Sequence, residues 1–287
     1  MDYDRWRHWR RSFRKALVTK LRAVLFDMAG TLVSISVFRD HNAVVRDEFV
    51  RLAQIKNATP ADIQKALVVA TSAVTPKITR RSFYRYHELT AARYAAAANI
   101  LNATLATADA DRVASLWWER CVEHFRCLMA TGDGLRPGAV ETIRAIKDAG
   151  LHVGLVSNID KHILAAFLDI GDWGSFFDSS ISSECAGSCK PDPKIFRMAL
   201  KQAGCKSAEA LFVGDTPSQD IVGAFAVGMR SALIRREECG LPNANLVAPR
   251  ADHEISQLAE LISLLRVYND GVNVLEKCIE PKGPVVV

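Results

Sequence analysis

A short apolar run that ends in a carboxylate is the feature that most constrains the fold of this chain. Residues 23–26 read Ala-Val-Leu-Phe, and Asp27, Gly30 and Thr31 follow directly. Such a run is typical of a buried strand in a parallel sheet. Open α/β sheets place their chemistry outside the carboxyl ends of their strands, so Asp27 is a candidate functional residue. Gly30 allows a sharp turn, and Thr31 offers a hydroxyl to a bound group.

Strand and helix patterns alternate along the second half of the chain. Strands are predicted at 151–156, 180–181, 210–213 and 230–234, and helices at 137–149, 161–170, 193–203, 219–227 and 254–265. Elements of these lengths in alternation form a parallel sheet with helices on both faces. We therefore expect an α/β fold with a doubly wound, Rossmann-like parallel sheet, to which the strand at 23–26 also belongs.

The segment between the first strand and this alternation is predicted to be all helical. Helical periodicity appears at 41–55, after Thr59-Pro60, at 80–101 and at 109–129. A cap residue followed by proline is a typical helix start. The expected organisation is a basic arm at 1–20, an α/β core at 21–37 and 132–268, an inserted helical domain at 38–131, and a tail at 269–287.

The composition is that of an ordinary soluble globular protein, with 49% hydrophobic and 24% charged residues in 287. No apolar stretch reaches the roughly 18–20 residues of a membrane span. Seven cysteines without a C-x-x-C pair indicate reduced thiols and a cytoplasmic location.

The formal charge of +5 is concentrated at the N-terminus. Residues 1–22 hold eight Lys/Arg and two Asp, so a basic surface for nucleic acid is not expected on the rest of the chain. A solvated terminus and contact with an anionic surface are both open for this Trp- and Arg-rich arm.

Polar residues also follow later strands and turns. Ser157 and Asn158 come after the strand at 151–156, where a hydroxyl and backbone N–H groups suit a phosphate oxygen. Asp160 is expected to cap the next helix. Lys190 precedes a rigid Pro-Asp-Pro turn that would direct its ammonium inward, toward a nucleophilic aspartate and a phosphoryl group.

Two further carboxylates follow the strand at 210–213. Asp215 ends this strand after Gly214, and Asp220 lies five residues later. Carboxylates that converge on Asp27 repel one another unless a cation lies among them. Mg²⁺, held by oxygen ligands and retained water, is the cation that we expect here.

The four motifs together resemble the signature of the haloacid dehalogenase superfamily. They are Asp27-Met28-Ala29-Gly30-Thr31, Ser157-Asn158, Lys190-Pro191, and Gly214-Asp215 with Asp220. The resemblance covers roughly 22–265, and it identifies the inserted helices with the mobile helical cap of that family.

This resemblance implies a hydrolase of a small phosphorylated or phosphonated metabolite. Asp27 would attack phosphorus and form an aspartyl phosphate, with Lys190 as a second catalytic residue that offsets charge. Thr31, Ser157, Asn158 and Lys190 would bind the phosphate. Mg²⁺ would be held by Asp27, the backbone carbonyl of Ala29, Asp215 and Asp220.

One position departs from the phosphatases of this family, which carry an acid/base aspartate where this chain has Ala29. The first motif is most similar to the phosphonatase-like branch, in which a cap lysine forms a Schiff base; Lys56, Lys65 and Lys77 are the candidates here. Two alternatives are a catalytically weak binding protein and a metal-free 2-haloacid dehalogenase. The retained pair Asp215 and Asp220 favours metal and phosphorus chemistry over the dehalogenase.

Overall fold

The computed structural model describes residues 19–38, 43–235 and 249–269. Its centre is a parallel sheet in the order β3-β2-β1-β4-β5-β6. The strands are β1 (Ala23–Phe26), β2 (His152–Ser157), β3 (Ser179–Ser182), β4 (Ala210–Gly214), β5 (Arg230–Ile234) and β6 (His253–Ile255). The strand order reverses direction between β1 and β4, and a crevice at the carboxyl ends of such strands is the usual ligand site of this fold.

Alternate residues of β1 enter two separate cores, because successive side chains of a strand point to opposite faces of its sheet. Val24 and Phe26 pack with α6 (Ala139–Asp148), α7 (Lys161–Leu168) and α11 (Glu260–Asn269). Ala23 and Leu25 face the opposite side.

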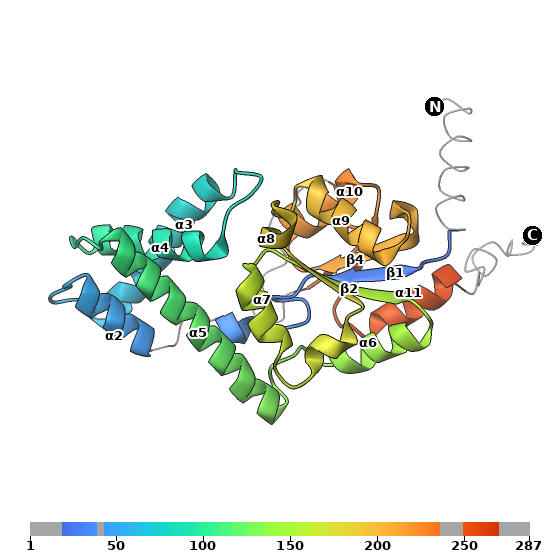
Figure 1. Cartoon of the computed structure of the whole chain (residues 1–287), viewed down its shortest axis with the longest axis horizontal. Coiled ribbons are helices and arrows are strands. Elements are labelled where there is room, and N and C mark those ends of the chain that lie inside the picture. Colours follow the sequence, from blue (N-terminus) through green and yellow to red (C-terminus); the bar gives the residue numbers. More distant parts are fainter. Residues whose placement is uncertain (1–18, 39–42, 236–248, 270–287) are drawn as a thin grey trace, which may run out of the picture.

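That second face is covered by α9 (Pro193–Ala203) and α10 (Val222–Ala226). Figure 1 shows these two helices on one side of the sheet and α6 and α11 on the other. The predicted doubly wound α/β class is therefore confirmed.

Residues 43–131 are mainly helical, and we call them the helical region. It consists of α2 (Ala43–Leu52), α3 (Pro60–Ile78), α4 (Tyr86–Ile100) and α5 (Thr107–Thr131). The region has a core of its own around Phe49 and Val113. Further along α5, Cys121 and Phe125 pack into the core of the sheet, so this long helix joins the two parts (Figure 1).

The remaining helices are short. They are α8 (Ser183–Ala186), 3-10 turns at Ile35–Phe38, Trp173–Phe176 and Ser207–Glu209, and a π-helical turn at Pro217–Ile221. In the described part of the chain, no helix has the length and apolar character that a membrane crossing requires.

Several predicted boundaries are corrected by the structure. The helix predicted at 254–265 starts too early: residues 253–255 form β6 along the edge of β5, and α11 begins only at Glu260. The helix predicted at 80–101 begins at Tyr86, because the backbone of residues 82–84 instead accepts hydrogen bonds from Cys189. The helix predicted at 219–227 is divided into the π turn and α10. Most of the basic arm and the C-terminal tail lie outside the described residues.

Candidate active site

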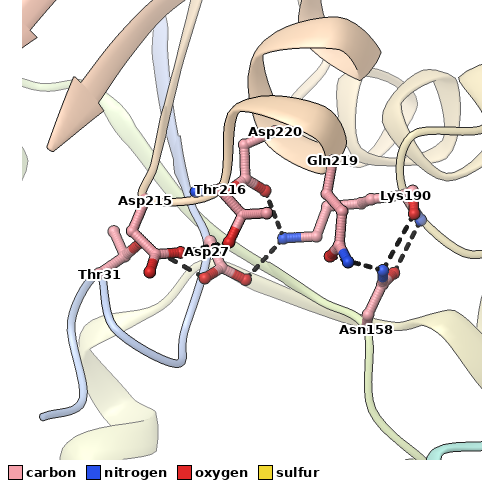
Figure 2. Close-up of polar contacts among 8 residues, drawn as sticks. All are labelled: Asp27, Thr31, Asn158, Lys190, Asp215, Thr216, Gln219 and Asp220. Carbon is pink, nitrogen blue, oxygen red and sulfur yellow. Dashed lines mark hydrogen bonds and ion pairs between the residues drawn. The ribbon is translucent and has the colours of Figure 1, made fainter. Parts of the chain in front are cut away.

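The predicted site residues meet at the carboxyl edge of the sheet. Asp27 follows β1, and Asp215 follows β4, the strand paired directly with it. Asp220 comes from the π turn after β4, and Lys190 from the loop before α9. Figure 2 shows these side chains converging from three segments that are far apart in the sequence.

Three carboxylates form the centre of the site. Asp27, Asp215 and Asp220 are all buried, and one ligand atom from each lies within 4.8 Å of the others. Gly214 makes room for this approach, since a Cβ there would lie 2.3 Å from the carboxyl carbon of Asp220. The carboxylate convergence expected from the sequence is thus present in the structure.

Lys190 bridges two of the three carboxylates. Its Nζ donates to Asp27 Oδ1 at 2.5 Å and to Asp220 Oδ1 at 2.7 Å. Burial by itself lowers the pKa of Lys190, but Asp220 and Asp27 raise this pKa by more, so the ammonium stays charged.

A second set of contacts fixes the Lys190 loop. The Asn158 side chain accepts from the Lys190 backbone N at 2.7 Å and donates to the Lys190 carbonyl at 3.0 Å. It also donates to Gln219 Oε1 at 3.1 Å, which ties the loop to the π turn (Figure 2). The Asn158 side chain is therefore a positioning group in the structure, while phosphate binding by this residue stays a prediction.

The loop after β1 is shaped by a glycine and an arginine. Gly30 has a φ of +84°, and a Cβ there would lie 2.4 Å from Asp215 Oδ2. The buried Arg136 donates to the Gly30 carbonyl at 2.7 Å. Thr31 is also buried and donates to Asp27 Oδ2 at 3.3 Å. The loop is thus held so that Asp27 and Asp215 face each other.

Thr216 supports the other two carboxylates. Its backbone N donates to Asp220 Oδ2 and its hydroxyl to Asp215 Oδ1, both at 2.9 Å. Thr216, Gln219 and Arg136 were not predicted as site residues. Thr216 and Gln219 lie within the last motif, but only the π turn shows that they face the site.

The donor set fits a hard divalent cation. The three carboxylates exceed the single ammonium by two formal charges in a buried cluster. Burial raises the pKa of Asp220, Lys190 opposes this rise, and the carboxylates of Asp27 and Asp215 add to it. A divalent ion would relieve this carboxylate repulsion, and an all-oxygen set is the kind that Mg²⁺ prefers.

Ser157 and Ala29 complete the predicted set. Ser157 is buried at the end of β2, beside Asn158. Ala29 lies in the loop after Asp27 and carries no ionisable side chain. All predicted site residues therefore lie in segments that meet at one edge of the sheet.

The helical region contacts this edge through the start of α4. The Asp160 side chain accepts from the backbone N of Tyr86 at 3.0 Å and of His87 at 2.9 Å. Asp160 is the N-cap residue of α7, as predicted, but its side chain makes no cap bond there. Its carboxylate instead satisfies free N–H groups at the start of α4.

Comparison with known proteins agrees with this geometry. A family model described as haloacid dehalogenase-like hydrolase matches residues 21–228. Haloacid dehalogenase-like hydrolase domain-containing protein 3 of Bos taurus is 35% identical over 128 residues, 45% of this chain and 50% of that protein. The ribulose-1,5-bisphosphate 5-phosphatase of Halopiger xanaduensis is 29% identical over 161 residues, 55% of this chain and 64% of that protein. The chain thus spans between half and two thirds of the length of these curated relatives.

Other matched relatives are 2-haloacid dehalogenases, so the sequence relatives include two kinds of chemistry. Among solved structures, the HAD-hydrolase YfnB of Bacillus subtilis, determined with bound magnesium, has a TM-score of 0.66 at 18% identity. The superposition covers 86% of this chain and 99% of that one. At this level of identity the likeness shows a common fold.

Proposed function

The chain belongs to the haloacid dehalogenase-like hydrolases, and we propose that it hydrolyses a small phosphorylated metabolite with Mg²⁺, through a covalent phosphate on Asp27. One observation carries this proposal: Asp27 lies in a buried cluster with Asp215 and Asp220, and Lys190 bridges two of the three. An acidic cluster of this kind suits a bound cation better than an apolar substrate.

Asp27 is proposed as the nucleophile. Its Oδ1 accepts a hydrogen bond from the Lys190 ammonium, and an aspartate carboxylate is a nucleophile that can attack phosphorus. Thr31 and Lys190 each hold one of its two oxygens and so orient the group. In-line attack on a phosphate ester would form a bond from a carboxylate oxygen of Asp27 to phosphorus and break the bond from phosphorus to the leaving oxygen. Water then cleaves the acyl phosphate.

The cation would be held by Asp27, Asp215, Asp220 and the backbone carbonyl of Ala29. When bound, Mg²⁺ supplies charge stabilisation at the phosphoryl oxygens. Lys190 adds positive charge at the same place, and Ser157 at the end of β2 is proposed as a phosphate ligand. The helical region is proposed to act as a cap over this edge. The seven cysteines, which include no C-x-x-C pair, support a cytoplasmic location for the enzyme.

Ala29 restricts the range of good substrates. General acid–base catalysis is worth about 10²–10⁴-fold, and position 29 supplies no proton donor. We therefore expect the enzyme to act best on phosphates whose leaving group departs without protonation, such as acyl or aryl phosphates.

A phosphonate substrate is favoured by the pattern Asp27-x-Ala29-Gly30-Thr31 but not by the candidate Schiff-base lysines. Lys56, Lys65 and Lys77 are all exposed, whereas Lys190 is the lysine that contacts Asp27. An imine with one of those three lysines is therefore not favoured by their surroundings, and we prefer phosphoryl transfer from oxygen.

Dehalogenation is the second candidate, because Ala29 and several relatives agree with it. Asp215 and Asp220 argue against metal-free chemistry, since two additional buried carboxylates around the nucleophile serve no evident purpose without a cation. A binding protein of low catalytic activity is the third candidate function. In that case an Ala29→Asp variant should gain phosphatase activity.

The test is phosphate release from a panel of phosphorylated metabolites and phosphonoacetaldehyde, with Mg²⁺ and with EDTA. Wild-type protein should release phosphate only with Mg²⁺, and Asp27→Asn should release none. Asp148→Asn, which changes an exposed carboxylate at the end of α6, is the matched control. Phosphate release that persists in Asp27→Asn would contradict the proposal. In a parallel assay with a 2-haloacid, halide release that EDTA does not affect would favour the dehalogenase.

A further inference from the structure

Arg136 is a buried arginine that joins three segments at the carboxyl edge of the sheet. Its Nη1 donates to the Gly30 carbonyl at 2.7 Å, and its Nη2 donates to the Arg235 carbonyl at 2.9 Å. Gly30 lies in the loop after β1, and Arg235 follows β5. Arg136 itself lies between α5 and α6, where its backbone N donates to the Leu32 carbonyl at 2.8 Å. One planar guanidinium thus fixes two carbonyls relative to each other.

Three successive backbone carbonyls in the loop after β1 differ in their partners. The Met28 carbonyl accepts hydrogen bonds from the backbone N of residues 31–33, and the Gly30 carbonyl accepts from Arg136. For the Ala29 carbonyl between them, the described part of the chain provides no hydrogen-bond donor. Ala29 is also only partly buried. Its carbonyl oxygen can therefore serve as a ligand without the loss of a hydrogen bond within the protein.

The backbone of Gly30 sets the direction of that carbonyl. The Gly30 N–H donates to the Val33 carbonyl at 2.8 Å. In a trans peptide the N–H and the C=O point in opposite directions, so the Ala29 carbonyl points away from Val33. Arg136 holds the next peptide, and Gly30 lies so close to Asp215 that a Cβ would be 2.4 Å from its Oδ2. Both peptides that flank Gly30 are therefore fixed beside a carboxylate of the candidate metal site.

We propose that Arg136 is a positioning residue for the Mg²⁺ site: through the Gly30 carbonyl it keeps the Ala29 carbonyl directed at the cation, and so sets the preference of the site for a small ion. This inference rests on the proposed function, in which the Ala29 carbonyl is a ligand of Mg²⁺. Mg²⁺ requires near-octahedral oxygen ligands at about 2.0–2.1 Å, whereas Ca²⁺ accepts about six to eight oxygens in flexible geometry. A carbonyl held in one direction therefore favours Mg²⁺, and a carbonyl that can turn reduces this preference.

The test compares Mg²⁺ and Ca²⁺ binding by calorimetry in wild-type protein and in Arg136→Met. The Mg²⁺ affinity of this variant should fall about 10- to 100-fold, the usual effect of removing a group that orients a metal ligand. The Ca²⁺ affinity should fall less than about threefold, because the larger ion tolerates a displaced ligand. Arg136→Lys keeps the charge but lacks the planar fork that spans two carbonyls, so its ratio of Mg²⁺ to Ca²⁺ affinity should be intermediate.

Arg230→Met is the matched control. Arg230 is also a buried arginine that donates to a backbone carbonyl, that of Thr19 at 3.0 Å, but it lies at the start of β5, at the opposite edge of the sheet. Both methionine variants should unfold at lower urea concentration than wild-type protein in EDTA. Only Arg136→Met should lower the ratio of Mg²⁺ to Ca²⁺ affinity, which separates positioning of a ligand from the loss of a buried hydrogen bond.

An unchanged affinity ratio in Arg136→Met, or an equal fall in Arg230→Met, would overturn the proposal. If Arg136→Met does not fold, Arg136→Lys provides the same ratio, and a wild-type value there would overturn it equally. If wild-type protein binds no Mg²⁺, the proposed function fails and this inference fails with it. Mg²⁺ binding with an unchanged ratio defeats the inference alone, so the two failures are distinguishable.

Discussion

The Lys190 ammonium lies between two of the three buried carboxylates of the site. Two carboxylate oxygens, one from Asp27 and one from Asp220, lie within 2.7 Å of its Nζ. Each carboxylate is buried, so neither can be screened by bulk water. The ammonium therefore has a structural role as well as the proposed catalytic one, and the two can be separated by measuring stability without metal.

Lys190→Met should destabilise the metal-free protein by about 3–5 kcal/mol, because removal of one partner leaves buried charges uncompensated. Urea unfolding in EDTA measures this loss. Adding Asp220→Asn to Lys190→Met should recover part of it, since one of the repelling carboxylates is then neutral. Lys194→Met, which changes an exposed lysine in the first turn of α9, is the control and should lose less than about 0.5 kcal/mol. Equal stability of the two lysine variants would refute the charge argument.

Gly30 provides a second test at the level of a single residue. Gly30 and Gly132 have similar φ values, +84° and +89°, but a Cβ at Gly132 meets nothing within 4 Å. Both alanine variants should lose about 1–3 kcal/mol from the left-handed backbone. Only Gly30→Ala should also weaken Mg²⁺ binding, because its Cβ would displace the Asp215 carboxylate. Calorimetric Mg²⁺ titration of both variants checks this, and equal affinities would show that the close approach is unimportant.

The start of α4 shows how one element is fixed to another. Asp160 follows β2, yet it caps a helix more than seventy residues earlier in the chain through Tyr86 and His87. A charged acceptor at a helix N-terminus satisfies free N–H groups and interacts favourably with the helix dipole. This contact joins the helical region to the edge of the sheet that carries the candidate site.

Asp160→Ala should therefore loosen the start of α4, with a loss of about 1–2 kcal/mol and faster amide exchange at Tyr86 and His87. Thr59→Ala is the matched control, since Thr59 caps α3 within the helical region through Asp62. It should show a comparable loss of stability without faster exchange at Tyr86. If the two variants give the same exchange at Tyr86, Asp160 does not hold α4 to the sheet.

Five of the six strands of the sheet could be predicted from sequence because each of the five carries its own local signal. Residues 23–26 and 210–213 are fully apolar runs, and a polar residue follows each at a known edge. β6 was missed because it is a short edge strand with little apolar character, which propensity alone does not separate from the start of a helix. The partners of the Asp160 carboxylate were missed for a different reason: a cap residue next to a helix start looks local, and only the tertiary fold shows that its side chain binds α4.

In the candidate site, too, some residues could be predicted from a local sequence signal, whereas others depend on the fold of the whole molecule. The three aspartates and Lys190 were predicted because each follows a strand or precedes a rigid turn, and parallel strands bring such positions to one edge. Thr216 and Gln219 had no such signal, since they lie at a π turn that local sequence does not distinguish from an ordinary helix start. Their contacts with Asp215, Asp220 and Asn158 depend on how this turn is placed beside the sheet (Figure 2).

Mg²⁺ should stabilise the whole protein, because a ligand that binds only the folded state shifts the unfolding equilibrium. At a concentration one hundred times the dissociation constant, the free energy of unfolding should rise by about 2.7 kcal/mol. Urea unfolding with Mg²⁺ and with NaCl of equal ionic strength separates binding from screening. Asp215→Asn should abolish the increase, whereas Asp148→Asn should keep it, because only Asp215 belongs to the carboxylate cluster. An equal increase with NaCl, or an unchanged one in Asp215→Asn, would show that the three carboxylates do not hold the ion.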